Sequence, residues 1–242
     1  MSLVSRMLPA SVKKALKRAL YSGDRYCPVC ESRIRAFLPY GVNPRPEARC
    51  PVCGSLERHR LLWLYFKDEA GLLSPPKKKM LHVAPERCLA ERLAACAEVD
   101  YLTADIADPS AMVKMDITDI RYPDDSFDVI YCCHVLEHVS DDRKAMREFA
   151  RVLKPSGWAV LQVPIDAEKT YDDASITEPK ERELHFGQSD HVRIYGPDYK
   201  GRLEDAGFVV SVVPYHERFS APEQERLGFS YEKDDIYLCR LG

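Results

Sequence analysis

Four of the nine cysteines form two Cys-x-x-Cys pairs, a spacing typical of metal ligands. The pairs are Cys27–Cys30 and Cys50–Cys53. Each pair can form a tight turn that directs two thiolates at one point, and two such turns complete the tetrahedron that Zn2+ prefers. Because four sulfurs leave no position for water, we expect a structural zinc site in a small ribbon, not a catalytic one. An iron site with the same ligands and four unmetallated buried cysteines are the alternatives.

A second group of polar residues follows stretches that read as apolar strands. Its members are Glu86, Asp105, Asp116 and the pair Cys133–His134. Parallel sheets bind ligands at the carboxyl ends of their strands, so we expect these residues to gather at one edge. Asp105 is spaced from Glu86 like the carboxylate that accepts both ribose hydroxyls in nucleotide-binding folds. Each acid taken singly has the alternative interpretation of a helix cap or a solvated side chain.

The elements that must position these residues alternate between strand and helix patterns from residue 80 onward. The strand candidates are 80–84, 100–104, 111–115, 127–132, 158–163, 208–213 and 235–241. The best-marked helix is 141–153, with Ser140 as its expected N-cap and Pro155 and Gly157 as its expected stop. This alternation predicts an α/β fold with a mainly parallel sheet covered by helices on both faces.

The amino-terminal part has a different composition. Residues 1–79 hold 16 Lys and Arg against 6 Asp and Glu, so residues 80–242 hold the remaining 19 against 32. The sequence predicts a basic amphipathic helix over 8–20 and, after the cysteines, a helix over 56–70 with Ser55 as N-cap. Ser74-Pro75-Pro76 then indicates a linker. We therefore expect two domains, 1–76 and 77–242.

Charge and hydropathy limit the partners and the compartment. The basic part could bind a polyanion such as nucleic acid or dock on the acidic part of its own chain. Its first helix could also contact a membrane surface, an interpretation that we do not favour over packing on the ribbon. No apolar stretch approaches the roughly 20 residues that a membrane span needs. The first twenty residues lack the apolar segment and cleavage site of a secretory signal, which predicts a cytoplasmic protein.

Several linked motifs resemble one known family. The segments 125–130 (DSFDVI), 133–139 (CHVLEHV) and 151–158 (RVLKPSGW) are similar to the central part of class I S-adenosylmethionine-dependent methyltransferases of the "type 11" kind. Residues 101–105 resemble that family's ribose-binding acid, 115–117 its adenine-contacting segment, and 191–195 with 203–208 its late segment. The resemblance covers about residues 77–242. It implies a seven-stranded, Rossmann-like sheet with an antiparallel last strand, and S-adenosylmethionine as cofactor.

One turn departs from the family pattern. The family has a glycine-rich turn after its first strand, whereas this chain reads Leu81-His82-Val83-Ala84-Pro85-Glu86. Ala84 is small enough for close approach of the cofactor, and Glu86 could meet the cofactor's amino group. Alternatively, the charge of Glu86 only favours the start of a helix over 87–97. The expected cofactor-binding residues are Ala84, Glu86, Asp105, Asp116, Ile117 and Cys133.

The chemistry of methyl transfer identifies candidate catalytic residues. The leaving group departs neutral, so alignment is the main requirement, and a base helps only to free the acceptor's lone pair. His134 is the first candidate base and His191 the second, whereas His138 is expected to serve packing or local hydrogen bonding. We expect an S-adenosylmethionine-dependent methyltransferase acting on RNA, a saccharide or other small molecule, or a protein. The alternative is a catalytically degenerate regulatory protein that uses the zinc ribbon as an interaction module.

Overall fold

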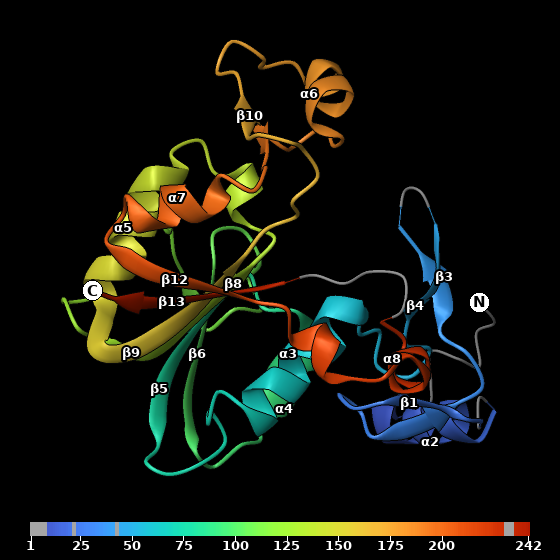
Figure 1. Ribbon diagram of the computed structural model, residues 1–242. Helices are drawn as coiled ribbons and strands as arrows, with labels where there is room; N and C mark the ends of the chain where they lie inside the picture. The colour runs from blue at the N-terminus through green and yellow to red at the C-terminus, as the bar shows by residue number, and fades with distance from the viewer. Residues whose placement is uncertain (1–8, 21–22, 42–43, 230–234) are drawn as a thin grey trace. The chain divides into compact units, whose positions relative to one another are not determined.

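The computed structural model describes residues 9–20, 23–41, 44–229 and 235–242 (Figure 1). Contacts divide the chain into two compact units. The cysteine unit comprises Met1–Leu73, Glu86–Ala95 and Pro214–Asp235, and the sheet unit comprises Ser74–Pro85, Cys96–Val213 and Ile236–Gly242. Two later segments thus belong to the same unit as the amino-terminal part. A single domain boundary between residues 76 and 77 does not describe this division. That boundary stays a prediction.

The sheet unit is built on seven strands in the order β12-β13-β9-β8-β5-β6-β7. Strands β7, β6, β5, β8 and β9 are parallel, and β13 runs antiparallel to both of its neighbours, β9 and β12. This arrangement confirms the predicted α/β fold and its antiparallel last strand. The bounds are β5 Lys78–Val83, β6 Val99–Asp105, β7 Val113–Lys114, β8 Phe127–Cys133, β9 Leu153–Gln162, β12 Phe208–Val213 and β13 Ile236–Leu241.

Helices α5 and α7 pack with the sheet in one apolar core (Figure 1). Met146 and Phe149 of α5 and Leu203 of α7 are fully buried there. The N-cap of α5 is Asp141 and not the expected Ser140, because the Asp141 carboxylate accepts the Lys144 backbone N–H at 2.9 Å. The other elements of this unit are η1 Leu136–His138, α5 Asp142–Val152, β10 Tyr171–Asp172, α6 Pro179–Phe186, β11 Arg193–Ile194 and α7 Tyr199–Glu204.

The cysteine unit contains two antiparallel hairpins, β1-β2 and β3-β4. Helix α3 starts at Glu57, and Ser55 does not cap it. The ring Nδ1 of His59 accepts the Leu56 backbone N–H at 3.1 Å instead. The elements are α2 Ala10–Leu20, β1 Arg25–Cys27, β2 Ser32–Ile34, β3 Leu38–Tyr40, β4 Arg45–Arg49, α3 Glu57–Asp68, α4 Arg87–Leu93, η2 Tyr215–Arg218 and α8 Ala221–Leu227.

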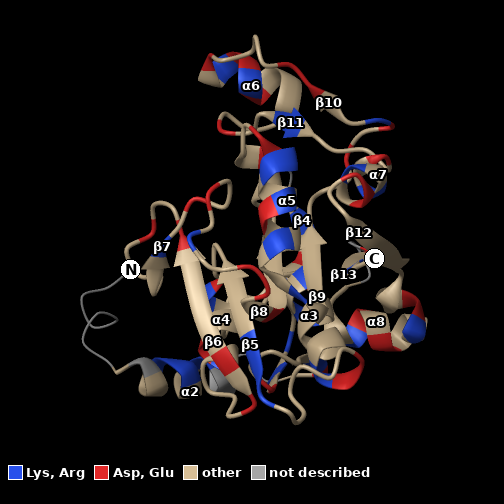
Figure 2. Cartoon of the chain, turned by 90° about the vertical axis from the view of Figure 1, so that its left-hand side faces the viewer, with Lys and Arg blue, Asp and Glu red and all other residues tan. Residues whose placement is uncertain are grey.

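Helix α2 confirms the expected basic helix over the part that the structure describes, and Leu8 lies outside the described residues. Its charged residues are all Lys or Arg (Figure 2). Val12 and Leu16 of the predicted apolar face are 45% and 51% exposed. The surface that this helix contacts therefore stays a prediction. Among the described residues, no helix combines the length and the apolar character that a membrane crossing requires.

Candidate functional site

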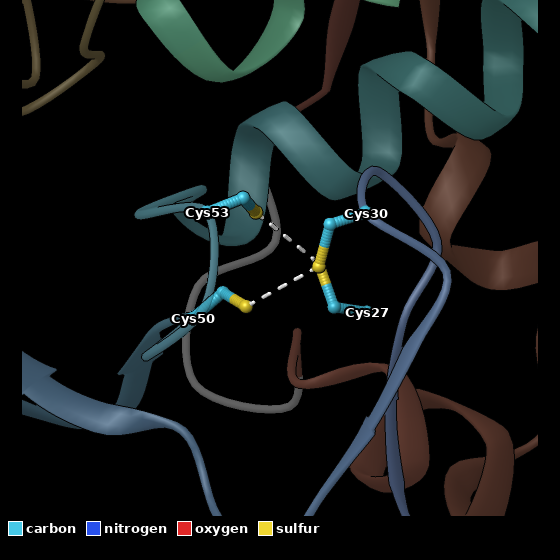
Figure 3. Close-up of side chains that lie close together, drawn as sticks. All are labelled: Cys27, Cys30, Cys50 and Cys53. Carbon is cyan, nitrogen blue, oxygen red and sulfur yellow. Dashed lines mark hydrogen bonds between the residues drawn. The ribbon is translucent and has the colours of Figure 1, made fainter. Parts of the chain in front are cut away.

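The four paired cysteines converge in the cysteine unit (Figure 3). Cys27 ends β1 and Cys30 lies in the following turn, while Cys50 and Cys53 lie in the turn after β4. Three of the four residues are buried and Cys53 is partly buried. The hairpins therefore bring two turns, distant in sequence, to one centre, as the spacing predicts.

The sulfur geometry fits a tetrahedral metal ion. Cys27 Sγ lies 3.7 Å from Cys53 Sγ, and Cys30 Sγ lies 3.8 Å from Cys50 Sγ. A tetrahedron with zinc–sulfur bonds of about 2.3 Å has sulfur–sulfur edges of about 3.8 Å. Burial raises the pKa of Cys27, whereas the hydrogen bond with Cys27 lowers the pKa of Cys53 to about 7. A divalent cation would favour the thiolate form of all four groups.

Two polar residues, Ser55 and Arg60, lie near the sulfurs. The Ser55 hydroxyl lies 3.2 Å from Cys27 Sγ and 3.3 Å from Cys53 Sγ, which explains why it does not cap α3. Arg60 of α3 is fully buried and donates to the carbonyls of Ala48, Ser55, Leu227 and Gly228. Burial lowers the pKa of Arg60, and the nearby Cys27 charge opposes that shift. A Zn2+ ion with four thiolates carries a net charge of −2, which a buried guanidinium partly balances.

The second site lies at the carboxyl edge of the sheet. Register pairs Val83 of β5 with Ala104 of β6 and with Cys132 of β8. The next residues along each strand, Ala84, Asp105 and Cys133, therefore meet at one edge, as predicted for Asp105 and Cys133. The strand order reverses between β5 and β8, and such switch points form the ligand-binding crevice of open α/β sheets.

Ala84 and Asp105 have features that suit a bound ligand at this edge. Ala84 has a φ of 48°, the left-handed conformation that the glycine expected at this turn would adopt without strain. The Asp105 Oδ1 accepts the backbone N–H groups of Ala107 and Asp108, both at 2.7 Å. Its Oδ2 makes no hydrogen bond within the described part of the chain, which leaves an acceptor oxygen for a ribose hydroxyl.

The remaining predicted cofactor residues differ in exposure. Asp116 is exposed, and its Oδ1 accepts from the backbone and hydroxyl of Thr118, which lowers the pKa of Asp116. Ile117 is buried in the sheet core and Cys133 is buried at the end of β8. The roles of these three residues stay predictions.

Glu86 belongs to the cysteine unit by its contacts. Its Oε1 lies 3.4 Å from Nε2 of the buried His59, whose pKa is lowered by burial. Because His59 Nδ1 accepts a backbone hydrogen bond, the ring proton lies on Nε2, facing Glu86. Glu86 precedes α4, which ends at Leu93 and is shorter than the predicted 87–97. Its role toward a cofactor stays a prediction.

Both candidate catalytic histidines lie in one cluster of the sheet unit. His134 follows β8, and its Nδ1 lies 3.5 Å from Oε1 of the buried Glu137. His191 is buried and packs edge-on against His138, with ring centroids 4.6 Å apart. Burial, and then the neighbouring His138, lowers the pKa of His191, so its ring is neutral at pH 7.

The cluster includes two residues for which no catalytic or ligand role was predicted. Potential ligand atoms of Glu137 and His138 lie within 4.8 Å of one on His191, although more than fifty residues separate them along the chain. No spacing rule covers such a separation. The only sequence signal is the presence of adjacent acid and imidazole side chains just past a strand end.

Comparisons with known proteins agree with this fold. Residues 76–161 match a methyltransferase domain family. A ubiquinone/menaquinone biosynthesis C-methyltransferase of Vibrio vulnificus is 33% identical over 111 residues, which are 40% of this chain and 43% of that protein. An uncharacterized methyltransferase of Bacillus subtilis, YcgJ, is 61% identical over 42 residues, 17% of each chain. This chain thus spans less than half the length of these curated relatives.

Among solved structures, an S-adenosylmethionine-dependent methyltransferase from Mesorhizobium loti aligns with a TM-score of 0.49 and 15% identity, covering 76% of this chain and 99% of that one. The family match begins two residues before β5 and ends within β9, so it spans the strands that carry Ala84, Asp105 and Cys133. The resemblance expected from the sequence motifs is confirmed over residues 76–161, the segment that matches the methyltransferase domain family.

Proposed function

We propose that the protein transfers a methyl group from S-adenosylmethionine to an acceptor at the carboxyl edge of the sheet. The observation that carries the proposal is the edge formed by Ala84, Asp105 and Cys133 inside the matched methyltransferase segment. The Asp105 carboxylate would hold the ribose hydroxyls, and the left-handed turn at Ala84 would let the backbone approach the methionine part. Bound S-adenosylmethionine supplies the methyl group.

Calorimetric titration of the full chain with S-adenosylmethionine tests this proposal. Saturable binding of about one cofactor per chain is expected. No detectable binding at millimolar cofactor would reject the enzyme and favour the alternative, a regulatory protein with a degenerate methyltransferase domain. Turnover is then measured as release of S-adenosylhomocysteine in the presence of RNA, saccharide and protein fractions, because the acceptor class is open. The excess of Lys and Arg in residues 1–79 is compatible with RNA.

His134 is the proposed base for an oxygen or ring-nitrogen acceptor. The Glu137 carboxylate, 3.5 Å from His134 Nδ1, would orient the ring and leave Nε2 to accept the acceptor's proton. The test is the pH profile of turnover in wild type and in His134→Gln. Loss of the acidic limb in the variant supports a base, whereas an unchanged profile with lower turnover would assign His134 to positioning only.

Glu86 keeps the proposed role of meeting the cofactor's amino group, in competition with its contact to His59. Glu86→Gln should weaken S-adenosylmethionine binding more than adenosine binding, because adenosine lacks that group. The ratio of the two affinities is insensitive to modest destabilisation. Equal losses of affinity for both ligands would show that Glu86 does not bind the amino group. Its role would then be the contact to His59 and the start of α4.

The four-cysteine cluster is proposed to hold a structural Zn2+ ion. The two sulfur–sulfur distances and the buried Arg60 support this ion, and a closed set of four thiolates gives it no position for a substrate. Elemental analysis of the purified chain should give close to one zinc per chain. Iron in place of zinc would retain the structural role with a different ion.

A further inference from the structure

A second cluster of potential metal-ligating side chains lies in the sheet unit. One potential ligand atom from each of Glu137, His138 and His191 lies within 4.8 Å of the others. Glu137 and His138 lie in η1, directly after β8, and His191 lies between α6 and β11. We propose that these three residues bind one divalent transition-metal ion at a site distinct from the four-cysteine cluster.

The contacts of the two Nδ1 atoms indicate which ring nitrogen of each histidine carries the lone pair. His191 Nδ1 lies 3.2 Å from the Phe186 carbonyl, which can only accept, so the proton is on Nδ1 and the lone pair is on Nε2. His138 Nδ1 lies 3.3 Å from the Asp190 carboxylate, which favours the same tautomer. Metal-binding histidines characteristically donate their second ring N–H to a carbonyl or carboxylate, and here one histidine contacts each kind of acceptor.

The backbone around the cluster is tied together across the long sequence separation. The Val192 N–H donates to the Glu137 carbonyl at 2.9 Å. The buried Arg193 guanidinium donates to the carbonyls of Leu136, Val139 and Ser140. The two segments that carry the three ligands are therefore held in register by groups that are not themselves ligands. Such support reduces the cost of organising a binding site when the ion arrives.

The donor set defines the class of ion. Two imidazole nitrogens and one carboxylate oxygen suit first-row ions such as Zn2+, Fe2+ or Co2+, whereas Mg2+ and Ca2+ prefer oxygen ligands throughout. Three protein ligands leave coordination positions open for water or for oxygen atoms of a small ligand. With its Nε2 bound to the ion, His191 would not serve as a base, and that role would fall to His134.

Titration of zinc-replete full-length protein with Co2+ tests the proposal, because thiolate and imidazole–carboxylate sites differ in their spectra. We expect about one Co2+ per chain with visible ligand-field bands and without the thiolate-to-cobalt charge-transfer band of a substituted cysteine cluster. His138→Ala should weaken this binding by at least about 10-fold. This side chain is 34% exposed, so its loss should leave the fold intact. Glu137→Gln provides the second ligand variant.

His185→Gln is the matched control, because His185 is an exposed histidine of the same unit that contacts Tyr171 and lies outside the cluster. It should bind Co2+ as wild type does. Asp190→Asn should cause a smaller loss than His138→Ala. Absence of the expected Co2+ equivalent, equal binding by wild type and His138→Ala, or an equal loss in His185→Gln would each overturn the site. The measurement needs no S-adenosylmethionine, so it can fail or succeed separately from the proposed activity.

Discussion

The described part of the molecule has two clusters of potential metal ligands, the four cysteines and Glu137–His138–His191. They differ in how far apart their ligands lie along the chain. In the first, each pair of ligands lies within one tight turn, and only two hairpins must meet. In the second, two ligands from η1 meet one that is more than fifty residues away, and Arg193 and Val192 join the two segments. Local spacing therefore revealed the first cluster, whereas the second depends on the completed fold.

The two clusters also differ in what their ions could do. Four thiolates fill a tetrahedron and leave a structural function. One carboxylate and two imidazoles would leave coordination positions open for a small ligand. The cysteine unit should thus respond to metal loss by unfolding, while the sheet unit should keep its fold and change only in ligand binding. The predictions below test this contrast.

The largest effect is expected from Cys50→Ser. Structural zinc contributes apparent binding free energies of roughly 10–16 kcal/mol in small zinc domains, so losing one ligand should release the ion and unfold residues 27–60. Zinc content and limited proteolysis measure the two consequences. Cys96→Ser, a partly buried cysteine of the sheet unit, should retain the metal. Zinc loss with unchanged protease resistance over 27–60 would contradict a structural role.

Arg60→Met should cost about 3–5 kcal/mol of the free energy of unfolding, because four buried carbonyls lose their donor and the cluster loses a neighbouring positive charge. Urea unfolding of the zinc-loaded protein measures the loss, and transfer of zinc to a chelator should be faster in the variant. Arg33→Met, an exposed arginine of β2, should change the stability by about 0.5 kcal/mol at most. Similar stabilities of the two variants would show that Arg60 does not stabilise the cysteine unit.

In the sheet unit, Asp105→Ala should weaken S-adenosylmethionine binding by about 1–3 kcal/mol, because the ribose hydroxyls lose their acceptor. Calorimetry measures the affinity. Asp105→Asn is the matched variant, since its amide oxygen can still accept from Ala107 and Asp108 and preserve the turn. An intermediate loss is expected for it. Equal affinities of wild type and Asp105→Ala would show that this carboxylate serves only the turn.

The succession of strands and helices along the sheet unit could be predicted from the sequence, because apolar strands and amphipathic helices differ in period. The residues at which these elements begin and end could not be predicted as well. The pair Pro155 and Gly157 suggested a stop between helix and strand, yet β9 begins at Leu153 and includes both. A Cβ at residue 157 would lie 2.7 Å from the Asp128 carbonyl, so this glycine permits close approach of β9 to β8. That requirement arises only from the neighbouring strand.

The helix caps and the second cluster were missed for a related reason. Ser140 and Ser55 are favoured N-cap residues, but Asp141 caps α5 and the Ser55 hydroxyl lies against sulfur. Propensity ranks residue types, whereas competing partners in the fold decide which of them is used. The sequence identified His134 and His191 separately as candidate bases. Their shared neighbour Glu137 became visible only once η1 and the segment before β11 were adjacent.

The smallest predicted effect concerns the turn that departs from the glycine-rich pattern. Ala84 adopts a φ of 48°, which strains a residue with a Cβ, so Ala84→Gly should raise the free energy of unfolding by about 1 kcal/mol. Ala104→Gly is the control, because Ala104 lies within β6, where glycine should lower stability by about 0.5–1 kcal/mol. The same substitution thus has opposite signs at neighbouring strands. A loss of stability in Ala84→Gly would show that packing of the Ala84 methyl group stabilises the fold by more than the strained turn destabilises it. The left-handed turn would then not explain how this chain replaces the family glycine.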